Sequence, residues 1–502
     1  MRARNSCLLT SLMLPLLGCS SSSSHTTTDA GKGDSGGTMH KTDSGTHADS
    51  GHARDAATCG NPCSDVSGTC VPIVAGESES DIVTAFSVAK AGTTLAFGAG
   101  TFAFTNTLAL LGVPNLTVRG AGMTETILDF SGQAAGSDGL DAQDSNHLTL
   151  WGFTVQNPKG NAIKVEQSSD VVFEAVKAAW TTPMGMNNGP YGIYPVSVQN
   201  LLIENCAVTG ASDSGVYVGQ SQNAVVRGND IYGNVAGIEI ENTWGAVVEN
   251  NQSHDNTAGI LVFDLPNLPQ QGGHDVRVMN NQVVSNNTLN FAQTGDIVSK
   301  VPAGTGVLVM ANHDVEVAGN TITGSNTVGI AVVSYLATLI PITDPHYYPY
   351  PYDVSLHDNT ISGSGSNIDS SVAIGLLLAS AVTTFPDQRG PDLAYDGAID
   401  PTKLADAGAG GDGGVNANAM NICFKNNGAA STFLDINIQK LEIYGEGDAG
   451  PAPADGGPTN LPLIDSFNIA PFTCALPATS QVDGGVTFVD ASPGASCDAS
   501  HP

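Results

Sequence analysis

The alternation of hydrophobic and polar residues is most regular between Asn200 and His274, where one short unit occurs three times. The copies begin at Asn200, Asn223 and Gly245, so the unit repeats after 23 and 22 residues. Each copy contains short runs of β-branched residues separated by Gly, Asn, Asp or Ser, which predicts short strands joined by turns. A unit of this length cannot bury a hydrophobic face alone and has to stack on its neighbours. The pattern therefore predicts an all-β, parallel β-helix.

Related units extend this prediction to a solenoid of roughly ten turns. The stretches T-L-A-F-G-A-G-T-F and N-L-T-V-R-G-A-G-M within 93–127 resemble the opening turns of pectate-lyase-like proteins, which implies a right-handed β-helix. The turns are expected to begin near Asn146, Asp170, Asn200, Asn223, Gly245, His274, His313 and Asp353. The shortest spacing is 22 residues, so longer spacings indicate inserted loops, the largest at 181–189, 286–303 and 335–352. An amphipathic stretch, Asp81–Ala91, is expected to cap the open N-terminal end of the stack.

A glycine or alanine before one strand of each turn fixes the register of the repeats. Strict alternation then directs one set of β-branched residues inward. This set comprises Ile163, Ile193, Val216, Ile238, Ile260, Val307 and Ile330. A second column consists of Asn229, Asn251, Asn281, Asn320 and Asn359. Its spacing predicts an asparagine ladder with a structural role.

The outward positions of the same strands are polar in the first half of the stack. They comprise Asp141, Gln143, Lys164, Glu166, Tyr194, Tyr217, Glu239 and Glu241. On adjacent turns these side chains are about 4.8 Å apart, and such a mixture of hydrogen-bonding groups and flat rings suits a carbohydrate. Lys164, Tyr194, Tyr217 and Glu239 are the candidates for acid–base catalysis. The alternative is that they are merely the solvated face of the solenoid.

The same column becomes apolar in the second half, with Leu261, Phe263, Leu308 and Met310 followed by Ala331 and Val333. A large apolar stripe is not expected to face water. We expect the Tyr335–Tyr352 loop or the C-terminal segment to cover it. An exported partner protein docked on Leu261, Phe263, Leu308 and Met310 is the alternative.

The chain of 502 residues has a formal net charge of −31, although only 13% of its residues are charged. This balance argues against binding to nucleic acid, whose phosphates would be repelled. It suits export, divalent cations or cationic partners, and it is also explained by solubility alone. Asp213 and Asp264 could bind calcium, but no D-x-D-x-D loop accompanies them. The cofactor is therefore left open, with calcium as the candidate.

The N-terminus has the features of an export signal. Arg2 and Arg4 precede a short apolar run, too short to span a membrane, that ends in L-L-G-C at Cys19. This ending resembles the lipobox of bacterial lipoproteins, which implies lipidation of Cys19, and Ser20 implies outer-membrane sorting. Residues 1–18 are then the signal peptide and 19–75 a low-complexity tether with a cysteine cluster. We expect an outer-membrane lipoprotein on the periplasmic side or the cell surface.

The β-helix is expected to span 76–385, and residues 386–475 to pack along it. In an exported protein the cysteines outside the leader favour disulfides over zinc, and Cys423 and Cys474 are the pair that could fasten this segment. The other pairings are left open. Residues 476–502 are expected to form a loose tail.

Asp344-Pro345-His346 resembles the D-P-H motif of alginate C5-epimerases. The residues before it, Pro341-Ile342-Thr343, depart from that family's pattern, and the motif occurs late in the stack. A turn-forming Asp-Pro is the alternative interpretation. No G-x-S-x-G, Walker A or H-E-x-x-H motif occurs at a suitable place.

Several longer phrases resemble one family of exported parallel β-helix repeat proteins. They include G-P-Y-G-I-Y-P-V-S-V-Q-N-L-L-I-E-N-C at 189–206, V-A-G-I-E-I-E-N, and the C-terminal N-I-C-F-K-N-N-G. The resemblance covers roughly 92–477 and implies a pectate-lyase-like fold and export, often beside a second exported partner. That family has no settled activity, so no catalytic residue is carried over.

These observations predict a lipid-anchored envelope protein that binds an acidic or neutral polysaccharide in a groove on its parallel sheet. A polysaccharide lyase or C5-epimerase is the first alternative. A lyase acting on uronates would need a basic groove, whereas Lys164 is nearly alone among carboxylates. A scaffold for an exported partner is the second alternative.

Overall fold

The computed structural model describes residues 61–382, 389–406, 418–428, 432–436, 438, 464–466 and 470–472. The signal peptide, Cys19, most of the tether, Cys474 and the tail lie outside these residues. Predictions that concern them therefore remain predictions.

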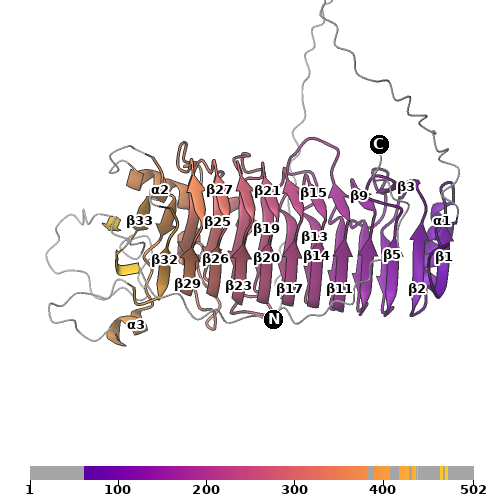
Figure 1. Ribbon diagram of the computed structural model, residues 1–502, viewed down its shortest axis with the longest axis horizontal. Coiled ribbons are helices and arrows are strands. Elements are labelled where there is room, and N and C mark those ends of the chain that lie inside the picture. The colour runs from indigo at the N-terminus through magenta and orange to yellow at the C-terminus, as the bar shows by residue number, and fades with distance from the viewer. Residues whose placement is uncertain are drawn as a thin grey trace, which may run out of the picture. The chain divides into compact units, whose positions relative to one another are not determined.

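Within the described residues the chain winds through three sheets, and each turn adds one strand to each sheet (Figure 1). Sheet A contains β1 Thr69–Ile73, β2 Thr93–Phe97, β5 Leu116–Arg119, β8 Leu148–Trp151, β11 Ser169–Glu174, β14 Gln199–Glu204, β17 Gln222–Arg227, β20 Trp244–Glu249, β23 His274–Met279, β26 His313–Ala318, β29 Tyr352–His357 and β32 Ile422–Lys425. Sheet B contains β3 Gly100–Ala103, β6 Thr126–Asp129, β9 Thr154–Gln156, β12 Lys177–Ala179, β15 Ala207–Thr209, β18 Asp230–Tyr232, β21 Gln252–His254, β24 Gln282–Val284, β27 Thr321–Thr323 and β30 Thr360–Ser362. The order of the turns confirms the expected β-helix.

Sheet C is the sheet on which the sequence placed the functional face. It contains β4 Leu108–Leu111, β7 Leu140–Gln143, β10 Ile163–Glu166, β13 Tyr191–Val196, β16 Ser214–Gly219, β19 Ala236–Glu241, β22 Ala258–Phe263, β25 Thr305–Met310, β28 Val328–Val333, β31 Leu393–Tyr395, β33 Phe433–Ile436 and β34 Ile464–Ser466. Neighbouring strands are parallel up to the last pair, β33 and β34, which is antiparallel.

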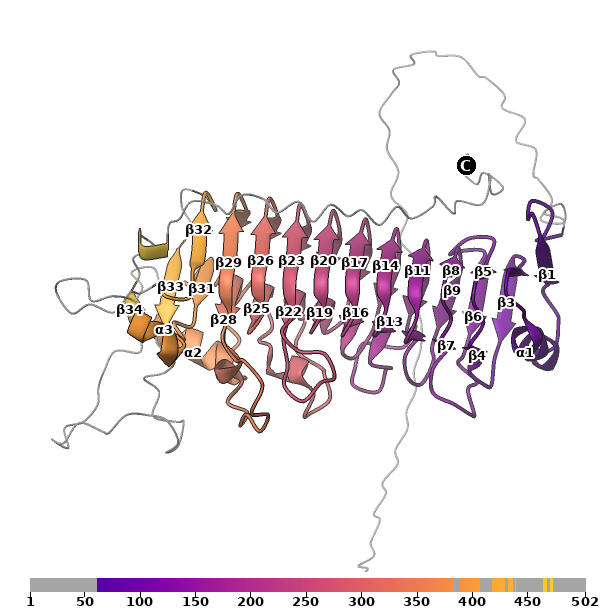
Figure 2. The ribbon, with the colours of Figure 1, turned by 90° about the horizontal axis from the view of Figure 1, so that it is seen from below.

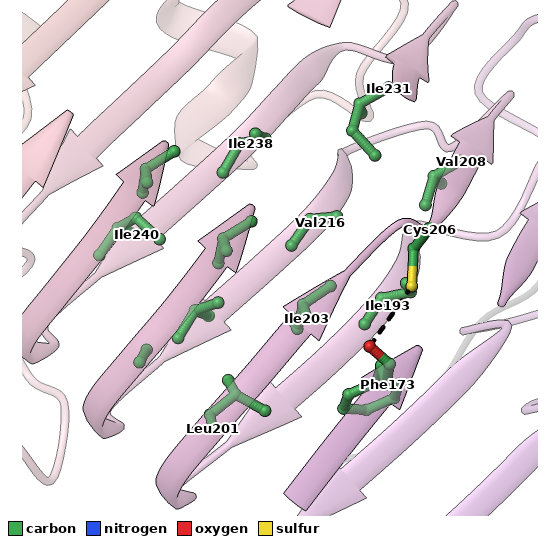
Figure 3. Close-up of a cluster of buried hydrophobic side chains, with 14 of the residues drawn as sticks. Phe173, Ile193, Leu201, Ile203, Cys206, Val208, Val216, Ile231, Ile238 and Ile240 are labelled. Carbon is green, nitrogen blue, oxygen red and sulfur yellow. Dashed lines mark hydrogen bonds between the residues drawn. The ribbon is translucent and has the colours of Figure 1, made fainter. Parts of the chain in front are cut away.

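The register of sheet C is the one that the sequence predicted. Ile163 pairs with Ile193, and the column continues through Val216 to Ile330 with every member fully buried. Figure 3 shows Ile193, Val216 and Ile238 of this sheet together with core residues of the other two sheets, among them Phe173, Ile203 and Ile231. The hydrophobic core is thus the interior of the coil, and it grows with each turn.

The asparagine ladder is confirmed at the turn from sheet A to sheet B. Each side-chain amide donates to the carboxamide oxygen of the next member at 2.8–2.9 Å. The ladder extends one turn further than expected, to Asn427. A second ladder, Asn234–Asn256–Asn286, lies at the turn from sheet B to sheet C and was not predicted.

Helix α1, Glu79–Val88, confirms the expected N-terminal cap (Figure 1). Ser78 begins the helix by accepting the N–H of Asp81, and Ile82 and Phe86 are buried in the core. Before the helix, Cys63 and Cys70 form a disulfide, which decides one of the pairings left open. Cys423 is also disulfide-bonded, with its partner outside the described residues.

The remaining helices belong to the loops and the C-terminal end. They are α2 Ala373–Val382, α3 Pro401–Asp406 and the short 3-10 helices η1 Ile297–Lys300, η2 Tyr335–Thr338 and η4 Ala470–Phe472. In the described part of the chain, no helix is long and apolar enough to cross a membrane.

The long loops flank sheet C on both edges. Residues 181–190 and 285–304 lead into it from sheet B, and residues 264–273 and 334–351 lead out of it to sheet A. Figure 2 shows the loops projecting from one side of the strands. Within the described residues, sheet C therefore has inserted loops along both of its edges.

The apolar half of sheet C is covered by the chain itself. Leu261, Phe263, Leu308 and Met310 are at most 1% exposed. They share one buried cluster with Val298 of the loop before β25, Tyr335 and Tyr347 of the loop before β29, and Leu378 of α2. The expected cover by the Tyr335–Tyr352 loop is confirmed. The alternative, an exported partner docked on these four residues, is wrong because the loops leave no surface for it.

Candidate functional site

The open part of sheet C carries the first five of the expected groove residues. Asp141 pairs with Lys164 and Lys164 with Tyr194 on successive strands, and Gln143 and Glu166 lie beside them. All five side chains are half-buried. The expected neighbours are therefore brought together on one accessible face.

Lys164 is an ion-paired lysine. Its Nζ lies 2.9 Å from Oε2 of Glu166. Burial alone would lower the pKa of Lys164, but the hydrogen bond and charge of Glu166, with Asp141 and Asp138, raise it above the ordinary value. A lysine must be neutral to accept a proton, so this environment opposes the role of general base considered for Lys164.

Tyr217, Glu239 and Glu241 also face outward from sheet C, as expected, but they are not on an open floor. They are 5%, 1% and 6% exposed. The reason is the loop cover that begins over the middle of the sheet, beside the apolar half. The groove expected from all eight residues is thus divided into an open part and a buried part.

The buried part forms one hydrogen-bonded cluster with Asp213, Ser214 and Tyr191. We call these six residues the carboxyl–tyrosine cluster: Tyr191, Asp213, Ser214, Tyr217, Glu239 and Glu241. Tyr217 donates to Oε1 of Glu241 at 2.5 Å, and Tyr191 donates to Asp213 at 3.3 Å. The rings of Tyr191 and Tyr194 stack with centroids 4.3 Å apart, and Tyr217 lies against both.

Ser214 lies between two carboxyl groups of the cluster. Its hydroxyl oxygen lies within hydrogen-bond distance of both Asp213 and Glu239 but has only one proton to donate. Oε1 of Glu239 is buried and has no hydrogen-bond partner. Two buried carboxylates that share one hydroxyl proton leave one of them without a donor, and this arrangement favours the protonated form of one carboxyl group.

The pKa shifts agree with this geometry. Burial raises the pKa of Asp213 to about 7 and that of Glu241 to about 7. Burial and the charges of Asp213 and Glu241 raise the pKa of Glu239 well above its ordinary value. These shifts favour the neutral form of Glu239, which is the form that can donate a proton.

Asp213 and Asp264, the calcium candidates, are both buried. Asp213 is bound to Ser214 and Tyr191, and Asp264 accepts the N–H of Gly273 at 2.8 Å. Across the described ranges, no three His, Cys, Asp or Glu side chains lie in an arrangement that could hold a metal ion. Sequence reasoning considered Asp213 only as a calcium ligand and missed its place beside Glu239.

The D-P-H sequence forms a turn, in agreement with the second interpretation. Asp344 accepts the N–H of His346 two residues later at 2.9 Å. Its other oxygen accepts the N–H of Asn267 and the amide of Gln271. Asp344 therefore ties together the two loops that lead from sheet C to sheet A.

A groove of about 600 Å³ lies at the corner between sheets C and A, beside the open part of sheet C. It is lined by Asn146, Gln167, Ser168, Ser169, Ser197, Val198, Gln199, Gln220, Gln222, Pro269 and Gln270. Gln143, on the open face, donates to Gln167 at 3.1 Å and so connects the two surfaces. We call this feature the corner groove.

A chain of amides holds the wall of the corner groove. Gln199 donates to Gln222 at 3.3 Å, and Gln222 donates to Gln270 at 3.2 Å. Gln270 is anchored by the carbonyls of Ser221 and Asn242 at 2.9 and 2.7 Å. This anchoring sets the side chains in place before any ligand arrives.

Sequence reasoning missed the corner groove, although a signal was present. Three successive strands of sheet C, β10, β13 and β16, are each followed by a triplet rich in uncharged polar residues: Q-S-S at 167–169, S-V-Q at 197–199 and Q-S-Q at 220–222. The first residue of each triplet has a left-handed backbone, with φ between 46° and 54°, and so turns the chain at the corner. The recurrence of uncharged polar residues at one corner was the available signal.

A comparison with models of protein families supports the fold. The family model described as "Right handed beta helix region" matches residues 138–287 and 185–341. No curated protein matches the chain. Three solved structures illustrate the structural matches, at 15–16% identity.

The first is the A-module of mannuronan C-5 epimerase from Azotobacter vinelandii, which has 15% identity and a TM-score of 0.39 over 63% of this chain and 86% of that one. The second is an exopolygalacturonase from Thermotoga maritima, with 16% identity and a TM-score of 0.41 over 55% and 76%. The third is an alginate lyase from Paenibacillus, with 16% identity and a TM-score of 0.38 over 57% and 94%. At these values the function has to be argued from this chain's own residues. The sheets and the family match together show that the chain has the fold of a right-handed parallel β-helix.

Proposed function

We propose that this protein is a lipid-anchored envelope protein that binds a polysaccharide in the corner groove and on the adjoining open part of sheet C. The observation that carries the proposal is the uncharged, amide-lined groove beside Asp141, Lys164, Glu166 and Tyr194. The sequence pointed to sheet C, and the corner groove moves the centre of the proposed site to the edge of that sheet.

The chemistry of the groove suits sugar hydroxyls. A hydroxyl group both donates and accepts a hydrogen bond, and a primary amide offers the same two functions. The glutamines are already held by one another and by backbone carbonyls, so binding costs little side-chain entropy. Half-buried Tyr194 offers a flat ring on the adjoining face.

The test is glycan binding by the secreted chain without its lipid anchor. Titration calorimetry with a panel of polysaccharides should detect binding that is weakened about tenfold or more by combined Gln199→Ala and Gln222→Ala, since two hydrogen-bonding groups are lost. The matched control is Gln252→Ala with Gln282→Ala, two exposed glutamines at the equivalent first positions of sheet B strands. Equal loss in both double variants, or no binding to any glycan, would contradict the proposal.

An enzyme, either a lyase or a C5-epimerase, is the second candidate. The observation that favours it is the buried carboxyl group of Glu239, whose pKa is raised, in one cluster with two tyrosines. Against it, Lys164 is ion-paired and the cluster is buried. Ultraviolet absorbance of unsaturated sugars and proton exchange at C5 would detect the two reactions. A signal abolished by Tyr217→Phe or Glu239→Gln would support the enzyme, and silence with binding retained would exclude it.

The anchor and the location are proposed from the sequence. Cys19 follows the apolar leader in the position of a lipidated cysteine. Expression with radiolabelled palmitate should label the chain, and Cys19→Ser should abolish the label and release the protein from the outer-membrane fraction. Labelling that survives Cys19→Ser would reject this anchor.

A further inference from the structure

We propose that the corner groove selects an uncharged glycan and rejects uronate chains. This inference rests on the proposed function, and it names the substrate class for the same site. It narrows the expectation from the sequence, which left an acidic and a neutral polysaccharide equally open.

The first argument is the absence of a usable cation. None of the residues that line the groove is charged. Lys164 is the cation of the adjoining face, and its Nζ lies 2.9 Å from Oε2 of Glu166. Asp141 is the residue that pairs with Lys164 on the neighbouring strand β7. A uronate carboxylate that enters the groove would therefore lose water without gaining an ion pair, which is unfavourable.

The second argument is the negative charge around the groove. Asp144 and Glu166 are on the edge of sheet C that faces it, and Gln220, part of the lining, lies 3.4 Å from the Glu241 carboxyl group. The whole chain has a formal net charge of −31. A polyanion would meet repulsion both at the site and on approach.

The third argument is the arrangement of the amides. Along the chain Gln199–Gln222–Gln270, Gln199 and Gln222 each use one N–H for the next glutamine, and Gln270 uses both for backbone carbonyls. Gln199 is exposed, and its carbonyl oxygen is a free acceptor in the groove wall. An acceptor at this position suits a hydroxyl, which can donate, and not a carboxylate, which cannot.

The fourth argument concerns length. Asn146, Ser169, Gln199 and Gln222 come from four consecutive turns, so the groove floor extends about 14 Å along the stack. Pro269 and Gln270 stand beside the last of these turns. A run of sugar residues fits this floor better than a single sugar does.

The experiment compares two ligands that differ only in charge. Polygalacturonate and its carboxyl-reduced derivative have the same backbone, and only the reduced form is neutral. Binding can be followed by the fluorescence of Trp244, which is 38% exposed. Trp244 on β20 pairs with the groove residue Gln222 on the neighbouring strand β17. Calorimetry on a wider panel of neutral glycans and alginate provides an independent readout.

The expected result is that neutral glycans bind at least about tenfold more tightly than their uronate counterparts, with little dependence on salt. Equal or tighter binding of the uronates would overturn this inference and leave the proposed function intact. No binding of any glycan in the panel would overturn the proposed function itself. The two failures are thus distinguishable.

A charge variant tests the same inference from the side of the protein. Gln199→Lys places a cation on the exposed edge of the groove and should shift the preference toward the uronate by about tenfold, with a new salt dependence. Gln282→Lys, at an exposed position on sheet B, changes the net charge equally and should have no such effect. Equal shifts in both variants would mean that net charge, not the groove, sets the selectivity, and would overturn the inference.

Discussion

The asparagine ladder and the carboxyl–tyrosine cluster are both stacks of buried polar side chains on successive turns of one solenoid. In the ladder, Asn251, Asn281 and Asn320 are fully buried, and each amide donates to the next at 2.9 Å. In the cluster, Glu239 keeps one oxygen without a protein donor. The hydrogen bonds of the ladder are made by protein atoms alone, whereas the cluster has to bind protons from solvent.

The chemical types of the two side chains explain the difference. A carboxamide has both a donor and an acceptor, so a column of identical amides can pair indefinitely. A carboxylate only accepts, and a column of carboxylates has to recruit hydroxyl groups or bind protons. Tyr191, Ser214 and Tyr217 supply hydroxyl groups here, and the raised pKa values of Asp213 and Glu241 supply the protons.

The largest expected effect comes from replacing an amide of the asparagine ladder with a carboxylate, the group found in the cluster. Asn281→Asp puts a carboxylate oxygen where the amide donates to the carbonyl of Val248 and to Asn320. Because an unpaired buried charge replaces two hydrogen bonds, we expect a loss of about 3–5 kcal/mol in the free energy of unfolding at pH 8. Denaturant melts followed by circular dichroism would measure it.

The control for this substitution is Asn280→Asp, the same change one residue earlier. Asn280 is exposed and has a left-handed backbone, which aspartate tolerates. We expect a change of less than about 0.5 kcal/mol. Similar losses in both variants would show that the ladder is not the origin of the stability.

The second prediction concerns the pH dependence of the unchanged protein. Asp213 and Glu241 have ordinary pKa values of 3.8 and 4.5 that burial raises to about 7 in the fold. Between these limits the folded state binds more protons than the unfolded state, so stability falls as the pH rises. The shift of Glu241 alone corresponds to about 3 kcal/mol. Melting temperatures should therefore be higher at pH 5 than at pH 8, and a higher value at pH 8 would contradict the account.

The third prediction is the reverse exchange, in which an amide replaces a carboxyl group of the cluster. In Glu241→Gln the new carbonyl can still accept from Tyr217, and the new amide can donate to the unpaired oxygen of Glu239. We expect a gain of about 2 kcal/mol at pH 8 and almost none at pH 5, where Glu241 is already neutral. Because general repulsion in an acidic protein also grows with pH, the comparison uses Glu249→Gln, on sheet A, as a control for charge. A gain in the control equal to that of Glu241→Gln would assign the effect to net charge.

The features that the sequence predicted are those that depend on spacing alone. The inward column from Ile163 to Ile330 and the asparagine ladder follow from one residue type that recurs at the length of one turn. The outward direction of Lys164, Tyr217 and Glu239 follows from the same register. Local periodicity is sufficient for these because each turn contacts only its neighbours.

The features that the sequence did not predict depend on the positions that the inserted loops take in the folded protein. Gln222 meets Gln270 across 48 residues, and this contact closes the corner groove. The burial of Glu239 depends on loops that pack on the apolar stripe further along the stack. Loop conformation is set by such distant contacts and leaves no periodic signal.

The smallest expected effect concerns Gln220, the amide that touches the cluster. Its Nε2 lies 3.2 Å from the hydroxyl oxygen of Tyr217 and 3.4 Å from Oε1 of Glu241, so it donates to these two acceptors of the cluster. Gln220→Ala should lower the free energy of unfolding by about 1 kcal/mol at pH 8, and by less at pH 5, where a protonated Glu241 needs no donor.

Gln167→Ala is the matched control, because Gln167 has the same left-handed corner position on a turn without a buried carboxyl group. Both residues line the corner groove, so both variants should weaken glycan binding, but only Gln220→Ala should change the pH dependence of unfolding. If both variants change it equally, the corner backbone and not the donated hydrogen bond is responsible.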